Sequence, residues 1–153
     1  MVRLDLGCGG LPERWKKGFT GVDIADYSDT YPGEFIQADL FVEMPFGNNS
    51  IEEVYSSHFI EHIPQNKVIW FFNEIYRILV TGGLLEIYVP PSTGRGAFCD
   101  PTHRSYWNDL SFRYYDMSWC RTLSESYGIK CNFKVEKVKT LNEFNLHALL
   151  RKV

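Results

Sequence analysis

The stretch LDLGCGG, residues 4–10, joins a short apolar run to three glycines. Val2–Leu6 reads as a strand that ends at this glycine turn. Glycine lets the backbone approach a ligand that a Cβ atom would repel, and ligands of parallel α/β sheets bind at the carboxyl ends of the strands. Residues 7–10 therefore predict a binding site. A tight turn without a ligand is the alternative, because this glycine pattern alone is common.

Other segments of the sequence also predict helices and strands. Apolar residues at three- and four-residue steps predict a helix over Gln65–Leu79, ended by Thr81-Gly82-Gly83. Alternating segments at Cys131–Val138 and Phe144–Leu150 predict an antiparallel hairpin. Strands interleaved with other segments indicate an α/β protein with a parallel sheet. The additional strands are predicted at Phe19–Ile24, Glu34–Asp39, Ile51–His58 and Gly83–Val89.

The first connections of this sheet are short. Residues 7–18 have room for about two helical turns, and ADYSDTYPG, residues 25–33, is rich in turn-forming residues. We therefore expect a seven-stranded, mostly parallel sheet with an antiparallel C-terminal hairpin and reduced helices. Incompletely covered faces favour a homodimer or an open cleft.

The composition fits one domain of 153 residues, with 44% hydrophobic and 23% charged residues. A net charge of −3 argues against binding to duplex nucleic acid. The start MVRLDLG lacks the apolar stretch of a secretory signal, and no apolar run is long enough to span a membrane. We therefore expect a cytoplasmic protein with reduced thiols and no membrane partner. No metal is predicted, because none of the four cysteines forms a CxxC pair.

Polar residues stand at the ends of the predicted strands that follow the glycine turn. Asp23 ends the second strand, where a carboxylate can accept hydrogen bonds from two ribose hydroxyls. Asp39 ends the third strand, and Ser57 and His58 end the fourth. Each could be a solvated loop residue, but all would lie along one edge of the sheet. Together they predict a nucleoside-type ligand at that edge.

With these residues in place, the sequence resembles the class I S-adenosylmethionine-dependent methyltransferases, which have a Rossmann-like sheet. LDLGCGG resembles their first motif, and GVDI resembles the strand that ends in the ribose-binding acid. The strongest match is the block from Gln37 to Val89. The resemblance divides the single domain, residues 1–153, into a cofactor-binding half, 1–90, and an acceptor region with the hairpin, 91–153.

The resemblance implies S-adenosyl-L-methionine as cofactor and a methyltransferase activity. Asp5, Gly7, Cys8 and Gly9 would border the methionine end of the cofactor. The remaining cofactor-binding positions that it implies are Asp23 and Ile24 at the ribose, Asp39 and Leu40 at the adenine, and Ser57 and His58 near the sulfonium.

Two departures from the family pattern are visible. Leu11-Pro12 stand where a third glycine is expected, and no helix precedes the first strand, which predicts a missing lid over the cofactor. A non-catalytic binding module on the same fold is therefore an alternative. A nicotinamide-dependent enzyme is a further one, although the GCGG turn and the short first crossover count against it.

The acceptor region, residues 91–153, contains further candidate catalytic and acceptor-binding residues. His103 follows the fifth strand and is the preferred general base; its alternative role is a loop histidine held by Asp100 or Asp109. His58 and His62 are further catalytic candidates, whereas His147 is interpreted as structural. Most aromatic residues between 91 and 127 are expected to close the sheet face that lacks helices. The residues proposed to contact the acceptor are Arg104, Tyr106 and Trp107.

The acceptor itself is expected to be a small molecule or to contain a sugar. The charge of the chain and the absence of a separate recognition domain favour such a molecule over a protein or duplex DNA. SSHF follows the fourth strand, in place of the tetrapeptide typical of enzymes that methylate nucleobase amino groups.

Overall fold

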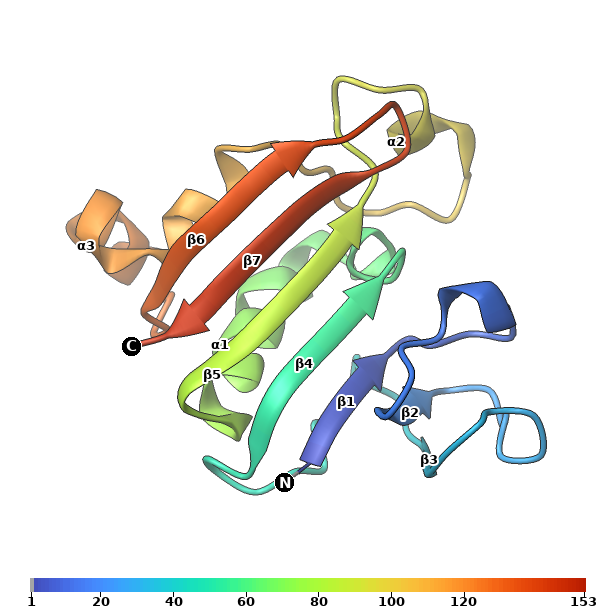
Figure 1. Cartoon of the computed structure of the whole chain (residues 1–153). Coiled ribbons are helices and arrows are strands. Elements are labelled where there is room, and N and C mark those ends of the chain that lie inside the picture. The colour runs from blue at the N-terminus through green and yellow to red at the C-terminus, as the bar shows by residue number, and fades with distance from the viewer. Residues whose placement is uncertain (1) are drawn as a thin grey trace.

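A computed structural model describes residues 2–153 as one seven-stranded sheet (Figure 1). The strands are arranged in the order β3-β2-β1-β4-β5-β7-β6. The first five strands are parallel, and β7 is antiparallel to both β5 and β6. The predicted fold is confirmed. The strand bounds are Val2–Leu6 (β1), Thr20–Asp23 (β2), Phe35–Gln37 (β3), Ile51–Ser57 (β4), Leu79–Val89 (β5), Phe133–Thr140 (β6) and Leu146–Lys152 (β7).

The strand order reverses between β1 and β4. The chain runs from β1 outward to β2 and β3 and then returns to β4 on the other side of β1. At such a reversal the connections leave the sheet in opposite directions, and a crevice opens at the carboxyl ends of the strands. The glycine turn after β1 and Ser57 at the end of β4 therefore lie at the same edge.

Helix α1 (Val68–Ile78) covers the middle of the sheet on one side (Figure 1). Its apolar residues recur on one face and are buried there. The predicted helix, residues 65–79, was too long at both ends. Residues 65–67 form a 3-10 turn, and Leu79 already pairs with Ile51 as the first residue of β5. The predicted glycine cap at Thr81-Gly82-Gly83 was also wrong, because the helix ends at Ile78, the backbone of Leu79 is extended, and Gly82, with φ of +81°, lies within β5.

The segment between β5 and β6 contains helical elements that the sequence did not predict. They are α2 (Gly96–Cys99), a 3-10 turn at Ser111–Tyr115 and α3 (Met117–Ser126). Tyr115 stacks on Phe72 of α1 with ring centroids 4.0 Å apart, and Trp107 lies 5.6 Å from the same ring. The expectation that most aromatic residues here close the sheet face without helices was therefore wrong: these rings extend the core on the α1 side.

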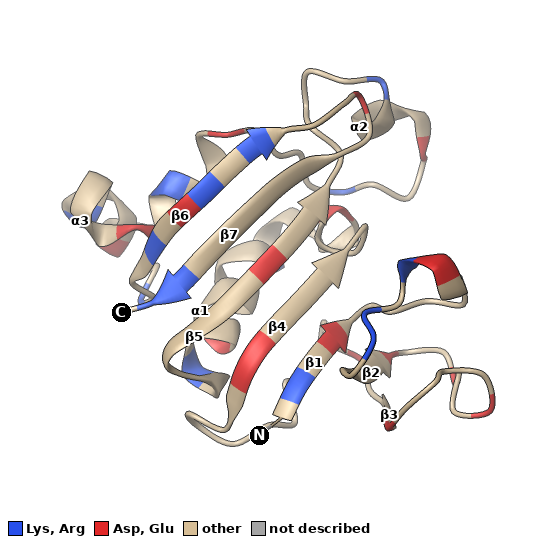
Figure 2. Ribbon diagram, viewed as in Figure 1, with Lys and Arg blue, Asp and Glu red and all other residues tan. Residues whose placement is uncertain are grey.

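The opposite side of the sheet carries no α-helix within residues 2–153 (Figure 1). Figure 2 shows acidic residues on β4 and β5 and basic residues on β6 and β7. Lys16 Nζ reaches across this face to Glu86 Oε2 at 2.8 Å, and His147 Nε2 lies 3.1 Å from Glu86 Oε1. The structural role predicted for His147 agrees with this contact. Charged and aromatic side chains, rather than helices, thus occupy this face.

The connection from β1 to β2 is held by a buried carboxylate. It contains only one 3-10 turn, Pro12–Arg14, rather than two helical turns. Asp5 is 1% exposed and accepts hydrogen bonds from the Lys16 backbone N–H at 2.8 Å and the Tyr31 hydroxyl at 3.3 Å. Burial raises the pKa of Asp5 to about 6, although both hydrogen bonds oppose the shift. A charged Asp5 is therefore destabilising at neutral pH.

The pKa shift of Asp5 from 3.8 to about 6 corresponds to about 3 kcal/mol at pH 7, so we expect Asp5→Asn to stabilise the protein there by up to about 3 kcal/mol. The folded protein binds a proton at Asp5 between pH 4 and pH 6, where the unfolded chain, with a pKa of 3.8, does not. The free energy of unfolding of the wild type therefore falls as the pH rises through this window, and the advantage of the variant disappears near pH 4. Urea denaturation at a series of pH values measures the difference. A constant difference from pH 4 to 7, or no difference from the exposed control Asp29→Asn, would contradict this assignment.

No helix within residues 2–153 has the length and apolar character needed to cross a membrane.

Candidate functional site

Two adjoining pockets lie at the carboxyl edge of the sheet, and His62 lines both. The first, called the apolar pocket here, has a volume of about 220 Å³. The second, the polar pocket, has a volume of about 570 Å³. The apolar pocket is lined by Gly7, Asp23, Ile24, Ala38, Asp39, Leu40, Phe41, Phe59 and His62.

The glycine turn forms one wall of the apolar pocket. Gly7 and Gly9 have φ angles of +64° and +58°, a region that side chains other than glycine rarely adopt. The Gly7 N–H donates to the carbonyl of Val22 at 2.8 Å, which fixes the turn against β2. A Cβ atom on Gly7 would stand 2.2 Å from the Phe59 ring. Glycine is thus required at position 7 by both conformation and space.

Asp23 connects the glycine turn to the end of β2. Its Oδ2 atom accepts from the Gly9 N–H at 2.9 Å, and its Oδ1 atom accepts from the Ala25 N–H at 3.0 Å. Each carboxylate oxygen has a second lone pair free for a ligand. Asp39 lies across the same pocket, where its Oδ1 atom accepts from the Phe41 N–H at 2.9 Å. Two anchored carboxylates therefore flank an apolar cavity.

Aromatic and aliphatic side chains line much of the apolar pocket. Phe41 and Phe59 stack with centroids 5.6 Å apart and an interplanar angle of 19°, and Leu40 and Ile24 line the cavity beside them. Such surfaces accept a planar aromatic group, whereas Asp23 can accept hydrogen bonds from hydroxyls.

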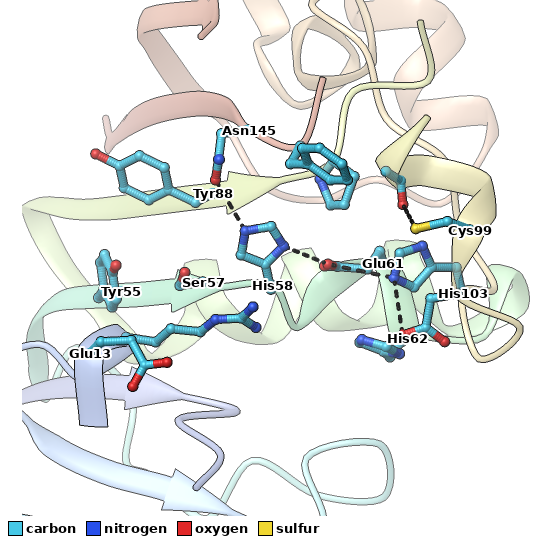
Figure 3. Close-up of a pocket in the computed structure, with 15 residues that line it drawn as sticks. Glu13, Tyr55, Ser57, His58, Glu61, His62, Tyr88, Cys99, His103 and Asn145 are labelled. Carbon is cyan, nitrogen blue, oxygen red and sulfur yellow. Dashed lines mark hydrogen bonds and ion pairs between the residues drawn. The ribbon is translucent and has the colours of Figure 1, made fainter. Parts of the chain in front are cut away.

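The polar pocket contains three of the four histidines (Figure 3). His58, at the end of β4, has a positive φ of +54°, a backbone strain that concentrates at functional positions. Its Nε2 atom lies 3.0 Å from Asn145 Oδ1, and its Nδ1 atom lies 3.3 Å from Glu61 Oε1. The pocket is lined by Glu13, Arg14, Tyr55, Ser57, His58, Glu61, His62, Tyr88, Pro90, Gly96, Cys99, Asp100, His103, Phe144 and Asn145.

His103 reaches this pocket because its loop is attached to Glu61. The backbone carbonyl of Glu61 accepts from the N–H groups of Arg104 at 2.7 Å and Ser105 at 3.0 Å. The ring then lies edge-on to His62, with centroids 4.9 Å apart. Its Nδ1 atom donates to the Ala97 carbonyl at 2.9 Å. Asp100 Oδ2 is 3.8 Å from Nε2, so the predicted contact with Asp100, but not one with Asp109, is present.

Most predicted cofactor residues lie at these pockets. Five line the apolar pocket, Ser57 and His58 line the polar pocket, and Gly9 is bonded to Asp23. Asp5 and Cys8 line neither pocket. Asp5 instead holds the loop at Lys16 from inside the protein, and Cys8 is 6% exposed. Burial raises the pKa of the Cys8 thiol to about 12, so it remains protonated. The five residues of the apolar pocket are Gly7, Asp23, Ile24, Asp39 and Leu40.

The acceptor residues predicted after His103 lie outside the polar pocket. Trp107 is 3% exposed, donates from Nε1 to Ser105 Oγ at 2.9 Å and packs between aromatic rings of the core. Arg104 is exposed, and Tyr106 stacks on Phe98 at the surface with centroids 4.9 Å apart. The prediction that Trp107 contacts the acceptor was wrong, because the core holds its ring.

Sequence reasoning missed Glu61, Phe59 and Asn145 as site residues. Glu61 is 2% exposed and follows His58 by three residues, so the stretch HFIEH, residues 58–62, already places two histidines and an acid on one turn. Phe59 lies within the same stretch. Asn145 reaches the pocket from the loop between β6 and β7, and no local sequence pattern predicts this position.

The chain matches the family model of the methyltransferase domain, Methyltransf_11, over residues 4–87. It is similar to the sterol 24-C-methyltransferase of Pneumocystis carinii, with 33% identity over 119 residues, or 66% of this chain and 31% of that protein. The Yarrowia lipolytica sterol 24-C-methyltransferase is 31% identical over 122 residues, which cover 68% of this chain and 31% of that protein. The chain thus spans about a third of the length of these relatives.

Solved structures share the fold. A SAM-dependent methyltransferase from Archaeoglobus fulgidus superposes with a TM-score of 0.69 at 16% identity, covering 99% of this chain and 86% of that one. Phosphoethanolamine N-methyltransferase 1 of Haemonchus contortus, solved with phosphoethanolamine and S-adenosylhomocysteine, gives 0.71 at 15% identity, covering 99% of this chain and 39% of that one. The resemblance to class I methyltransferases, and S-adenosyl-L-methionine as the cofactor of the group, are confirmed. The family match over residues 4–87 and the shared fold establish that this chain belongs to the methyltransferase domain family.

Proposed function

We propose that this chain transfers a methyl group from S-adenosyl-L-methionine to a small polar acceptor bound in the polar pocket. The observation that carries the proposal is the adjacency of the two pockets. One is apolar and flanked by Asp23 and Asp39, the other is lined by histidines and carboxylates, and His62 belongs to both.

The apolar pocket would hold the adenosine group of the cofactor. Asp23 would accept hydrogen bonds from the ribose hydroxyls, while Leu40 and Phe41 would contact the adenine beside Asp39. Ser57 and His58 line the neighbouring polar pocket and would lie on the methyl-donor side of the bound cofactor. When bound, the cofactor supplies an electrophilic methyl group and a neutral thioether leaving group.

The protein chiefly has to align the acceptor with the methyl group of the cofactor. The acceptor atom must be held at about 3–3.5 Å from the methyl carbon, in line with the bond that breaks. His58, His62 and His103 converge on the pocket. Imidazole side chains commonly act as general acids and bases in enzymes. They are suited to orient the acceptor and to receive its proton where methylation requires one to leave.

The lining of the polar pocket favours a polar acceptor over a sterol. Sterol 24-C-methyltransferases act, by their name, on a sterol, which is a large apolar molecule. This pocket instead presents charged and hydrogen-bonding groups such as Glu13, Arg14, Asp100 and Asn145. Burying apolar carbon against these groups would leave them without hydrogen bonds. We therefore favour hydroxyl- or amine-bearing small molecules, including sugars.

The test is a methyl-transfer assay on a panel of acceptors. S-adenosylhomocysteine formation is measured by mass spectrometry with sugar phosphates, hydroxy acids, small amines and a sterol. We expect acceptor-dependent turnover with at least one polar class and none with the sterol. Cofactor binding without turnover on any acceptor would contradict this proposal and favour a non-catalytic binding module. Turnover with the sterol alone would contradict the proposed acceptor class.

A further inference from the structure

A buried carboxylate that accepts no hydrogen bond within residues 2–153 lines the polar pocket, with His58 Nδ1 at 3.3 Å from its Oε1 atom. Glu61 is 2% exposed, and neither Oε1 nor Oε2 has a hydrogen-bond partner among residues 2–153. A carboxylate removed from water in this way requires a cation or a hydrogen-bond donor nearby. The side-chain groups nearest to Glu61 are imidazoles, so the positions of their ring protons decide whether Glu61 receives a hydrogen bond.

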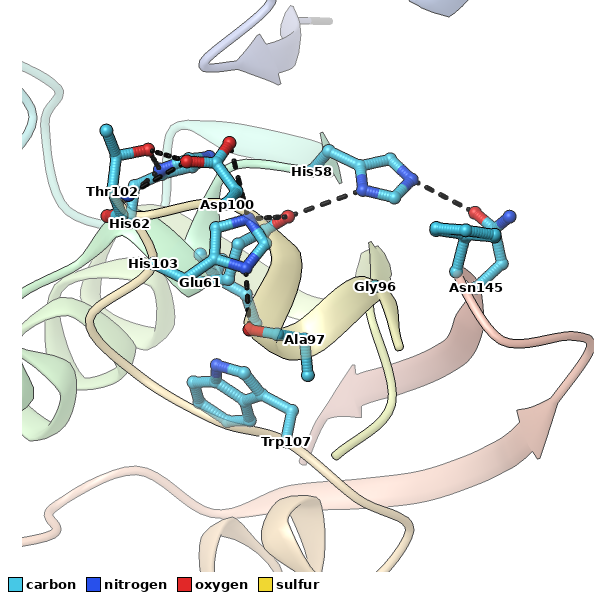
Figure 4. Close-up of polar contacts among 12 residues, drawn as sticks. His58, Glu61, His62, Gly96, Ala97, Asp100, Thr102, His103, Trp107 and Asn145 are labelled. Carbon is cyan, nitrogen blue, oxygen red and sulfur yellow. Dashed lines mark hydrogen bonds and ion pairs between the residues drawn. The ribbon is translucent and has the colours of Figure 1, made fainter. Parts of the chain in front are cut away.

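The Nδ1 atoms of His103 and His62 contact hydrogen-bond acceptors other than Glu61 (Figure 4). His103 Nδ1 is 2.9 Å from the Ala97 carbonyl oxygen, which can only accept. His62 Nδ1 lies 3.3 Å from the Thr102 carbonyl oxygen and 3.0 Å from Thr102 Oγ1. That hydroxyl donates its own proton to Asp100 Oδ1 at 2.6 Å, so it too accepts from His62.

Both rings are therefore protonated on Nδ1, which in a neutral imidazole leaves the Nε2 lone pair free. A backbone or hydroxyl acceptor on one ring nitrogen is the arrangement that orients a histidine for metal binding through the other. His103 Nε2 lies 3.9 Å from Glu61 Oε1, too far for a hydrogen bond. Two electron-rich atoms thus face one another across a gap suited to a positive ion.

The three side chains converge from two separate segments of the chain. One ligand atom from each of Glu61, His62 and His103 lies within 4.8 Å of the other two. Small side-chain rotations would bring all three to about 2.1 Å from a single ion. The hydrogen bonds from the Arg104 and Ser105 N–H groups to the Glu61 carbonyl hold the two segments in this register.

We propose that Glu61, His62 and His103 bind one divalent transition-metal ion in the polar pocket. Two imidazole nitrogens and one carboxylate favour zinc, iron, cobalt or nickel over magnesium or calcium, which prefer oxygen ligands. Three protein ligands leave a coordination position that faces the pocket. If the proposed function holds, this position takes an oxygen or nitrogen atom of the methyl acceptor. The metal site itself does not depend on that function.

The test is calorimetric titration of zinc into the full chain after removal of metals with a chelator. We expect one equivalent to bind with a dissociation constant in the micromolar range or below. Glu61→Gln and His103→Gln should each weaken zinc binding by at least about 100-fold. Substitution with cobalt should give visible absorption bands in the wild type and not in these variants.

Two matched controls sharpen the test. His147→Gln removes an imidazole that also faces a carboxylate, Glu86 at 3.1 Å, but on the open face of the sheet. Cys99→Ser removes a thiol that lines the polar pocket. Both controls should retain wild-type zinc affinity.

Three results would overturn the metal site: no zinc binding at about 100 μM, wild-type affinity in both ligand variants, or loss of affinity in Cys99→Ser. S-adenosylhomocysteine binding in each variant confirms that the fold is intact. Zinc binding without cofactor binding would contradict the proposed function and leave the metal site standing. Turnover without zinc binding would overturn the metal site alone.

Discussion

Asp23→Ala is expected to weaken the binding of S-adenosylhomocysteine by at least about 100-fold. Two hydrogen bonds from ribose hydroxyls to a carboxylate would be lost, each contributing about 1.5–3 kcal/mol. The alanine also releases the Gly9 N–H, which Asp23 Oδ2 accepts at 2.9 Å, and so loosens the glycine turn. Isothermal titration calorimetry measures the change.

Asp26→Ala is the matched control for this variant. Asp26 lies three residues further on, outside both pockets, and its Oδ1 atom accepts from the Ser28 N–H at 2.9 Å in the same kind of turn. We expect wild-type affinity in this control. An affinity of Asp23→Ala within threefold of the wild type would show that the ribose is not bound at Asp23.

The largest expected effect on stability comes from Gly7→Ala. The positive φ costs a side chain about 1–2 kcal/mol, and the new Cβ atom would displace the Phe59 ring, which packs on Phe41 and Phe71. We expect a loss of about 3 kcal/mol or more in the free energy of unfolding, measured by urea denaturation. Cofactor binding should be lost as well, because the same ring lines the apolar pocket.

Substitutions at two other glycines distinguish the cost of backbone strain from the cost of steric crowding. Gly82 has φ of +81° with no atom within 4 Å of a built Cβ, so Gly82→Ala should lose about 1 kcal/mol and keep cofactor affinity. Gly9 also has a positive φ and open space around a built Cβ, but its N–H donates to Asp23, so Gly9→Ala should lose about 1 kcal/mol of stability and also much cofactor affinity. Equal destabilisation by Gly7→Ala and Gly82→Ala would contradict the packing argument.

The sequence predicted the sheet well because its signals are local. Each strand of the first half ends in a glycine, an acid or a histidine, and the parallel arrangement brings these ends to one edge. The roles of Gly7, Asp23 and Asp39 as pocket residues follow from that register alone. Asp5 is the exception, because alternation along β1 turns its side chain toward Lys16 and Tyr31 and away from the pockets.

The acceptor region was harder to predict because its contacts join distant segments. His103 meets Glu61 only because backbone hydrogen bonds attach residues 104 and 105 to the end of the HFIEH stretch. Trp107, two residues beyond Ser105, is an aromatic residue of the kind that often contacts ligands. Its ring instead packs between Phe72 of α1 and Phe112. The prediction of no metal rested on cysteine spacing, which carries no information about a histidine–carboxylate cluster assembled by the fold.

The most direct test of this account is a crystal structure of the chain with S-adenosylhomocysteine. We expect the adenine between Leu40 and Phe41, the ribose hydroxyls hydrogen-bonded to Asp23, and the sulfur directed toward His58 and the polar pocket. A ligand bound elsewhere on the molecule, or one whose sulfur points away from His58 and Glu61, would contradict it.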